Sequence, residues 1–321
     1  MFPVVLHRRE EMAEGLARYE FKAPDGGELP PFQAGGHIDV VIAPEYQRPY
    51  SLAGDPADRS HYVLGVLREP PESGGRGGSA LMHRAFREGR RVFVSRPVNH
   101  FALHEDATHS WLFARGIGVT PMIAMAHRLH ALGKPFDFHY SAASRTTAGF
   151  LKDLAQAPWG HQVQYHFKDE GLRADLMQLL PDHAPGQHVY TCGAPRFMDG
   201  VFEAATAHGW PSDAMHREYF SVPEADAWVN QPFELLLQKS GRRLQVPAER
   251  SATDVLAEAG VGFSVKCSDG LCGVCALPYD AQASDAVEHR DFVLSHQARQ
   301  HKIILCCSRA QQAGGVISLD F

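Results

Sequence analysis

The most specific chemical pattern in this chain is a set of cysteines near its end. Cys267, Cys272 and Cys275 lie in the stretch Cys-Ser-Asp-Gly-Leu-Cys-Gly-Val-Cys, and the adjacent pair Cys306 and Cys307 follows after a long gap. Three thiolates on one tight loop and a fourth from a distant segment suit a flat two-iron cluster, because each tetrahedral iron takes two protein thiolates. The spacing therefore predicts a 2Fe–2S cluster.

The residues between these cysteines fit the same chemistry. Ser268, Asp269, Gly270 and Gly273 are small or turn-prone, so the backbone N–H groups of the loop can face the bridging sulfides. The alternative is a structural zinc site, which usually pairs its cysteines as two C-x2-C motifs. The x4 gap and the distant fourth cysteine argue against zinc.

Composition limits the remaining possibilities. The chain has 321 residues, 44% of them hydrophobic, which is enough for two or three domains with full cores. The net charge of -6 favours no nucleic-acid partner. No apolar run is long enough to cross a membrane, and the first residues do not have the pattern of a signal peptide. Six cysteines, mostly in cluster spacing, favour a reducing cytoplasm over a disulfide framework.

Hydrophobic patterning divides the elements into three groups. Short apolar runs separated by Pro and Gly, such as His37–Ile42 and His61–Arg68, predict an antiparallel β-barrel, with a short helix at Ser79–Arg87. From Ser110 onward strands and helices alternate, which favours a parallel α/β sheet. These predicted elements are Trp111–Ala114, Pro121–Leu132, Phe136–Tyr140, Phe150–Gln156, Val163–Phe167, Leu172–Leu180, His188–Cys192 and Pro195–His208.

A polar segment without periodicity precedes the cysteine-rich region and is predicted to be a linker. After it, Phe233–Gln238 and Arg243–Pro247 indicate a hairpin, and Thr253–Ala259 a helix capped by Ser251 or Thr253. The expected domains are a barrel, an α/β domain, a linker and a cluster domain, at residues 1–103, 104–222, 223–231 and 232–321.

Two glycine-containing turns mark a nucleotide site in the α/β region. Gly116, Gly118 and Thr120 lie where a predicted strand joins a helix, so phosphates can approach the N–H groups of the helix N-terminus. Such turns are common, and the motif alone is a weak signal. Cys192 and Gly193 follow a later strand, at the edge where open α/β sheets bind ligands. For Cys192, a small buried core residue is the alternative interpretation.

The barrel contains Arg48-Pro49-Tyr50-Ser51-Leu52 and, further on, Gly74-Gly75-Arg76-Gly77-Gly78-Ser79. The first stretch alone would be unremarkable in a surface turn. Together the two could hold a flavin: Tyr50 would stack on the ring, Ser51 would bond its edge and Arg48 would neutralise phosphate. The glycine loop would supply a phosphate nest before the helix.

These motifs together resemble the phthalate dioxygenase reductase family over essentially the whole chain. The order matches as well: flavin-binding antiparallel β-barrel, ferredoxin reductase-like α/β nucleotide domain, and β-grasp plant-type 2Fe–2S ferredoxin domain. Further matching stretches are Val66-Leu67-Arg68, Glu218-Tyr219-Phe220, Glu288-His289-Arg290-Asp291 and Cys306-Cys307-Ser308-Arg309. The resemblance implies FMN, NADH and a 2Fe–2S cluster, and it selects Cys306 over Cys307 as the fourth ligand.

The resemblance also implies roles for individual residues. Ser51, Cys192 and Phe220 would lie at the reacting rings, with Phe220 covering the flavin where nicotinamide must stack. The cofactor-binding residues would be Arg48, Tyr50, Ser51, Leu52, Arg68, Gly77, Gly78, Ser79, Gly116, Gly118, Thr120, Cys192, Gly193 and Phe220. The cluster ligands would be Cys267, Cys272, Cys275 and Cys306.

Two residues depart from the family pattern. Arg115 stands where similar proteins have the first glycine of the nucleotide turn, and it could bind pyrophosphate or hinder the nicotinamide. Ser144 and Arg145 follow a predicted strand, and such a pair can recognise an adenosine 2′-phosphate. The hypothesis is that Arg145 permits some use of NADPH.

The expected function is transfer of electrons from NADH through FMN and the cluster to a terminal oxygenase, which would bind transiently at the cluster edge. That docking face would include Ser268, Asp269 and Leu271. The oxygenase would be of the Rieske type, and the reductase a cytoplasmic monomer. The alternatives are a self-standing NAD(P)H:acceptor reductase serving quinones, ferric iron or a haem monooxygenase, and a non-enzymatic iron–sulfur sensor. The nineteen histidines show no metal-ligand spacing.

Overall fold

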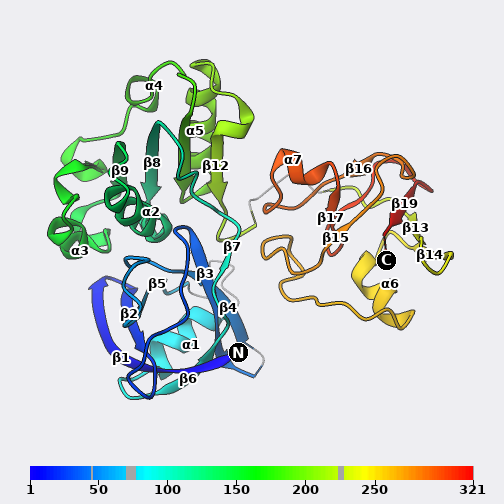
Figure 1. Ribbon diagram of the computed structural model, residues 1–321, viewed down its shortest axis with the longest axis horizontal. Helices are drawn as coiled ribbons and strands as arrows, with labels where there is room; N and C mark the ends of the chain where they lie inside the picture. The colour runs from blue at the N-terminus through cyan, green and yellow to red at the C-terminus, as the bar shows by residue number, and fades with distance from the viewer. Residues whose placement is uncertain (45, 70–76, 223–227, 321) are drawn as a thin grey trace. The chain divides into compact units, whose positions relative to one another are not determined.

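The computed structural model describes residues 1–44, 46–69, 77–222 and 228–320, which form two compact units (Figure 1). The larger unit spans Met1–Arg217 and the smaller one starts at Glu218. This division assigns residues 218–222 to the smaller unit. The domain boundaries at 103, 222 and 231 stay a prediction, and residues 223–227 of the predicted linker lie outside the described residues.

An antiparallel barrel forms the first part of the larger unit. Its strand order is β4-β3-β6-β1-β2-β5, with β7 paired to β3, and a bridge between Leu52 and Leu64 joins the two ends. The strands are β1 (Phe2–Ala13), β2 (Leu16–Lys22), β3 (Gly36–Ala43), β4 (Tyr46–Ser51), β5 (Tyr62–Leu67), β6 (Arg91–Val94) and β7 (Val98–Asn99). Alternate side chains of β2 are fully buried, as a one-sided strand requires. The predicted barrel is confirmed.

Helix α1 (Gly78–Ala85) packs against β3 and β4. Gly77 caps it with a φ of 80°, a left-handed conformation that glycine adopts without steric cost.

The second part of the larger unit is a five-stranded sheet of order β10-β9-β8-β11-β12, in which β10, β9, β8 and β11 are parallel. The strands are β8 (His109–Arg115), β9 (Phe136–Ala142), β10 (Val163–Phe167), β11 (Gln187–Cys192) and β12 (Met215–Glu218). The helices are α2 (Val119–Ala131), α3 (Leu151–Gln156), α4 (Leu176–Leu179) and α5 (Pro195–Ala207). Single 3₁₀ turns are η2 (Gly116–Gly118), η3 (Arg145–Thr147), η4 (Gly160–Gln162), η5 (Lys168–Glu170) and η6 (Ser212–Ala214). The predicted strand–helix alternation is confirmed.

The predicted helix over Leu172–Leu180 is wrong in its first half, because α4 begins only at Leu176. Gly171 has a φ of 75° and ends the preceding turn, and the N–H of Leu172 donates to the carbonyl of Phe167. Asp175 is extended and precedes the helix. Apolar spacing suggested a longer helix, but the backbone of this segment is engaged in the loop that follows β10.

The barrel and the parallel sheet share one hydrophobic core. Gly65 of β5 lies at their junction, where an added β-carbon would be 2.6 Å from the Phe150 ring, 2.8 Å from Thr120 and 2.9 Å from Ile117. Any side chain at residue 65 would therefore separate β5 from the nucleotide turn. The two halves of the larger unit are packed as one body.

The smaller unit consists of short strands and helices around its own core. The strands β14 (Arg242–Val246), β13 (Phe233–Leu237) and β19 (Val316–Leu319) form one sheet in that order. Two ribbons pair β15 (Ala276–Pro278) with β17 (Lys302–Ile304), and β16 (Val287–Glu288) with β18 (Arg309–Ala310). The helices are α6 (Ala252–Glu258) and α7 (His296–Arg299).

The hairpin predicted at the start of this unit is confirmed as β13 and β14. Ser251 caps α6, accepting from the N–H of Asp254 in a reciprocal capping box.

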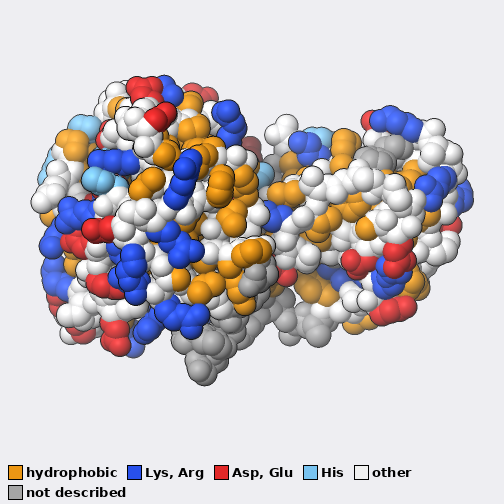
Figure 2. Space-filling model, turned by 90° about the horizontal axis from the view of Figure 1, so that it is seen from below, with side chains coloured by type: hydrophobic (Ala, Val, Ile, Leu, Met, Phe, Trp, Pro, Cys, Tyr) orange, Lys and Arg blue, Asp and Glu red, His pale blue; other side chains and the backbone are white. Residues whose placement is uncertain are grey.

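Within the described residues, none of the helices has the length and apolarity needed to span a bilayer. Figure 2 shows basic and acidic side chains interspersed over the visible face of the larger unit.

Candidate redox site

The cysteine loop brings four thiols together in the smaller unit. Cys272, Cys275 and Cys306 are buried and Cys267 is half-buried. The pKa of Cys267 is lowered, first because the Cys272 thiol and then because the Cys306 thiol donates a hydrogen bond to it. The pKa of Cys275 is lowered to about 7, mainly by a hydrogen bond from Cys306. Thiols that interact in this way lie around one small volume, and an all-sulfur donor set is the chemistry of iron–sulfur ligation.

The geometry distinguishes the two adjacent cysteines. Cys306 donates hydrogen bonds to Cys267 and Cys275 across the loop, and also to its neighbour Cys307. The Cys307 sulfur lies 3.8 Å from the carbonyl oxygen of Ile304 and close to Gly270 of the loop. The arrangement favours Cys306 as the fourth ligand, as the resemblance implied.

Left-handed backbone conformations shape the loop. Ser268, Gly270 and Gly273 have φ values of 62°, 74° and 68°. The N–H of Asp269 lies 3.4 Å from the Cys267 sulfur and points toward it. A β-carbon at Gly270 would be 2.8 Å from the Cys307 sulfur, so this buried position has no room for a side chain. The loop therefore presents N–H groups inward, which suits bridging sulfides.

Two arginines from the matching motifs brace this unit. Arg290 donates to the Asn230 side chain at 2.6 Å and to the Val229 carbonyl at 3.0 Å, and its guanidinium lies over the Trp228 ring. Arg309 donates to the carbonyl of Gln231 at 3.1 Å. Both arginines thus hold the segment that leads into β13.

The nucleotide turn and the end of β11 meet closely in the larger unit. A β-carbon at Gly118 would lie 2.2 Å from the Cys192 carbonyl oxygen and 2.7 Å from the Gly193 nitrogen. Gly193 has a φ of 151° and would place a β-carbon 2.8 Å from that of Arg115. Only glycine allows these two strand ends to touch. The structure therefore brings Gly118, Cys192 and Gly193 together, as expected for one nucleotide site.

The other residues of the turn are arranged around this contact. Thr120 is buried, and its hydroxyl donates to the Ile117 carbonyl at 3.0 Å. Gly116 has a φ of 56°, and a β-carbon added there would meet nothing within 4 Å among the described residues, so its surroundings are open. Arg115 is exposed and its guanidinium lies 5.8 Å from the centre of the Phe197 ring. Arg115 is therefore turned toward α5.

The barrel places the expected flavin residues on β4 and at the start of α1. Arg48 donates to the Gln47 carbonyl at 2.9 Å, and its side chain would be 3.1 Å from a β-carbon at Gly78. A side chain at residue 78 would therefore push Arg48 away from the helix N-terminus. This pairing of a guanidinium with free helix N–H groups fits a phosphate.

The neighbouring residues on this segment have different exposures. Tyr50 is half-buried, and desolvation by burial raises the pKa of its phenol, so it stays neutral. Ser51 is 6% exposed, and Leu52 is fully buried within the barrel. Along this segment the chain thus passes from half-buried Arg48 and Tyr50 to buried Ser51 and Leu52.

Arg68 and Ser79 are less clearly grouped with the other expected flavin residues. The Ser79 hydroxyl accepts from the N–H of Glu69 at 3.1 Å, which joins the end of β5 to α1. The Arg68 side chain lies over Gly15 and lines a surface pocket with Glu11 and His83. Of the glycine-rich stretch 74–79, residues 74–76 lie outside the described residues.

Phe220 belongs to the smaller unit and is 43% exposed. Its neighbour Tyr219 packs edge-on against Phe292 at 4.9 Å, and the N–H of Phe292 donates to the carbonyl of Gly270 in the cysteine loop. The Glu-Tyr-Phe segment is therefore joined by packing to the cluster loop. The roles of the individual site residues stay predictions.

Sequence reasoning missed two features of the larger unit. Arg145 forms two hydrogen bonds with Glu170, at 2.6 Å and 3.3 Å. Glu170 lies on η5 after β10, so no local pattern links the two. The other feature is that His104, His188 and His216 gather in space although they are far apart in the chain.

Comparison with known proteins extends this description. Residues 92–215 match the family model of the N-terminal domain of dimethylamine monooxygenase subunit DmmA-like proteins, and residues 235–311 match that of the 2Fe–2S iron-sulfur cluster binding domain. The chain is 36% identical to the vanillate O-demethylase oxidoreductase of Pseudomonas sp. (strain HR199 / DSM 7063), over 99% of this chain and 100% of that protein.

Among solved structures, phthalate dioxygenase reductase, described as modular for electron transfer from pyridine nucleotides to [2Fe–2S], matches with a TM-score of 0.69 and 34% identity. The match covers 100% of this chain and 98% of that one. The chain belongs to the phthalate dioxygenase reductase family. It is an electron-transfer oxidoreductase with a unit for flavin and nicotinamide binding and a 2Fe–2S domain, of the kind that serves multicomponent oxygenases.

An intact type IV self-sufficient cytochrome P450 monooxygenase also matches this reductase, with a TM-score of 0.88 and 34% identity. The match covers 99% of this chain but 41% of the P450 chain, so the reductase spans less than half of that protein. The same module thus occurs both as a separate chain and fused to a haem domain.

Proposed function

We propose that this protein is the reductase component of a two-component, Rieske-type oxygenase, and that it takes electrons from NADH through FMN to its cluster. The observation that carries the proposal is the convergence of four cysteine thiols in the same chain as a barrel packed on a nucleotide-binding sheet. When bound, the nicotinamide supplies a hydride, the flavin accepts an electron pair and releases it singly, and the cluster carries single electrons outward.

In this proposal, residues of the chain position groups rather than transfer protons. The Gly118–Cys192 contact keeps side chains out of the nucleotide site, and the packing at Gly65 fixes that site against β5 of the barrel. The cysteine loop directs N–H groups toward the sulfurs. Because the barrel and the sheet share one core, the two rings would meet in a frame that is already formed.

FMN is the proposed flavin because the described residues of the barrel place a cation beside a helix N-terminus. Arg48 and the N-terminus of α1 provide a cation and free N–H groups at a single place. A terminal ribityl phosphate needs one such place. HPLC of the flavin released from purified protein would test this choice, and recovery of FAD would refute it.

NADH is the proposed donor because Glu170 engages Arg145. Both Glu170 oxygens accept from this guanidinium, which offsets its charge and occupies donors that a 2′-phosphate would need. Arg145 stands just after β9, on the edge of the sheet where the nucleotide is expected. The pair therefore favours a ribose without a 2′-phosphate.

The cluster edge is the proposed docking face for the oxygenase. Ser268 is exposed, and Val265 and Val274 are each 42% exposed on either side of it. Asp269 and Leu271, also expected there, are half-buried. A small patch of mixed apolar and polar character suits a transient redox contact. We further propose a cytoplasmic monomer; the use of four of the six cysteines in cluster spacing supports a reducing compartment.

Anaerobic addition of NADH to the purified holoprotein tests the whole sequence of transfers. We expect the flavin absorbance to bleach in stopped flow, followed by the rhombic EPR signal of a reduced 2Fe–2S cluster. Bleaching without that signal would refute the path through the cluster, and no bleaching would refute the donor.

A haem monooxygenase is the second candidate partner, because the fused P450 shares this module. Mixing the reduced protein with a purified Rieske-type oxygenase component, and separately with a purified cytochrome P450, discriminates the two. Faster reoxidation of the cluster by the Rieske protein supports the first proposal, and preference for the haem protein supports the second.

A further inference from the structure

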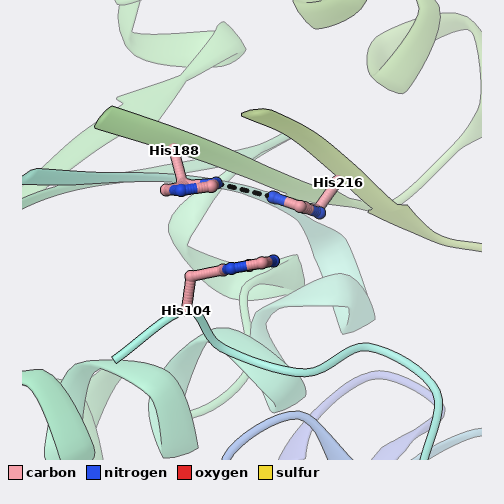
Figure 3. A group of neighbouring side chains, drawn as sticks. All are labelled: His104, His188 and His216. Carbon is pink, nitrogen blue, oxygen red and sulfur yellow. Dashed lines mark hydrogen bonds between the residues drawn. The ribbon is translucent and has the colours of Figure 1, made fainter. Parts of the chain in front are cut away.

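Three histidines from separate segments meet on the larger unit (Figure 3). His188 lies on β11, His216 on the neighbouring edge strand β12, and His104 on the connector between β7 and β8. One ring nitrogen of each residue lies within 4.8 Å of the others. Figure 3 shows His188 and His216 side by side, with the His104 ring stacked beneath them.

The contacts within this group are tight. Nδ1 of His188 and Nε2 of His216 are 2.9 Å apart and share a hydrogen bond. The centre of the His104 ring lies 4.3 Å from that of His188 and 4.8 Å from that of His216. Three imidazoles are thus held within reach of a single point by parts of the chain that are far apart in sequence.

The surroundings hold two of the three rings in place. The Tyr190 ring stacks on His216 at 4.7 Å, and its hydroxyl accepts from the backbone N–H of His104 at 2.9 Å. That hydrogen bond fixes the connector beside the sheet without using the His104 side chain. Because the His104 side chain is exposed, its ring can turn.

We propose that His104, His188 and His216 bind one divalent transition-metal ion, with Zn²⁺ as the reference case. Neutral imidazole is the commonest protein ligand for such ions, and three nitrogens leave a fourth position for water. Tetrahedral zinc with Zn–N bonds of about 2.0–2.1 Å separates its nitrogens by about 3.3 Å. The pair on β11 and β12 needs to open by only a few tenths of an ångström, and His104 completes the set by leaving the stack.

The charge around the group is compatible with a cation. The carboxylates of Asp106 and Asp213 favour positive charge at His188, whereas the rings of His104 and His183 oppose it.

The metal site is separate from the redox path. His188 is the second residue of β11, and Cys192 ends the strand about 13 Å away at ~3.3 Å per residue. A bound ion would cross-link the connector to β11 and β12. The expected consequence is a more stable larger unit, with the nucleotide turn left untouched.

Isothermal titration of Zn²⁺ into the tag-free holoprotein tests the proposal. We expect one equivalent to bind, with affinity at least tenfold weaker in His104→Ala and in His216→Gln, and unchanged in the exposed control His161→Ala. His104→Ala is the decisive variant, because its side chain is exposed and the backbone hydrogen bond to Tyr190 remains. Equal affinity in wild type and His104→Ala, or no binding by the wild type, would overturn the proposal.

The Zn K-edge absorption spectrum identifies the ligands independently of activity. Three nitrogen neighbours and one oxygen support the histidine site. Sulfur neighbours, or loss of iron from the protein during the titration, would place the zinc at the cysteines and overturn the assignment. Neither readout depends on electron transfer, so failure of the proposed oxygenase function would not affect it.

Discussion

At the scale of single residues, the direction of a side chain decides roles that type and spacing leave open. The cysteine spacing alone identifies three ligands, but it cannot decide between the adjacent Cys306 and Cys307 for the fourth. The structure distinguishes their contacts, because Cys306 donates to Cys267 and Cys275, whereas the Cys307 sulfur lies near the Ile304 carbonyl and Gly270. In the same way the sequence shows the charge of Arg145 but not its partner, because Glu170 comes from another strand end.

We expect Cys306→Ser to abolish the visible absorbance and EPR signal of the cluster while the flavin remains. Cys307→Ser should keep both signals, because Cys306 is the residue that donates to Cys267 and Cys275, while the Cys307 sulfur lies near the Ile304 carbonyl. The measurement is iron content together with EPR of the reduced protein. Loss of the cluster only in Cys307→Ser would show that the ligand has been assigned to the wrong residue.

Glu170→Gln should raise the kcat/KM ratio of NADPH to NADH about fivefold, because it frees the exposed Arg145 guanidinium for a charge-assisted bond with the 2′-phosphate. Steady-state reduction of ferricyanide with each nucleotide measures the ratio. Arg145→Ala is the matched control and should lower NADPH use in the Glu170→Gln background. An unchanged ratio in both variants would remove Arg145 from the nucleotide site.

At the scale of elements, strong hydrophobic periodicity predicted the type and order of the helices and strands well. The residues at which they begin and end depended on backbone hydrogen bonds, which periodicity does not show. Strand β10 begins and ends where the apolar pattern does. The failure over residues 172–175 has a local cause: the loop after β10 uses the N–H of Leu172. The long strand β1 escaped prediction because its second half is polar and charged and pairs with β2 at the barrel surface.

The contact between the nucleotide turn and β11 is the element-level feature most sensitive to substitution. Gly118→Ala should raise KM for NADH at least about fivefold, because its β-carbon would overlap the Cys192 carbonyl and overpacking of this kind costs about 1–3 kcal/mol. Gly116→Ala is the control: its φ is positive, but its surroundings are open, so its effect should be smaller. Stopped-flow reduction at several NADH concentrations separates binding from the transfer rate. Equal effects in the two variants would argue against the close approach.

At the scale of the whole molecule, the sequence predicted three modules in order, but not how they group or which distant residues meet. Two of the modules share a core, and the histidines at 104, 188 and 216 come together only through folding. Long-range proximity of this sort leaves no periodic trace in one sequence. Buried ionisable groups inside such a shared core also couple its stability to pH.

His139 makes that coupling testable. It is 1% exposed between Phe113 and His166, and desolvation lowers its pKa to about 4 from an unfolded value near 6.5. The unfolded state therefore takes up a proton first, and stability present above pH 6.5 is lost as pH falls toward 4. We expect His139 to account for a loss of about 2 kcal/mol between pH 6.5 and pH 5.

Urea unfolding of the larger unit, followed at both pH values, measures this loss. His139→Phe keeps an aromatic ring in the stack and removes the titration, so its acid loss should be smaller by that amount. If the variant loses as much unfolding free energy between the two pH values as the wild type, other titratable groups cause the acid sensitivity.

Residue 65 is a glycine, and this has a consequence for how domains of such reductases can be recombined. Because β5 packs directly against Ile117, Thr120 and Phe150, the surface of the barrel is complementary in shape to this particular nucleotide turn. A chimera that joins this barrel to the nicotinamide domain of another protein would have a packing mismatch at this interface. Exchange after Arg217 keeps the barrel and the sheet together, so residues 1–217 are the unit to transfer when new electron-transfer proteins are built.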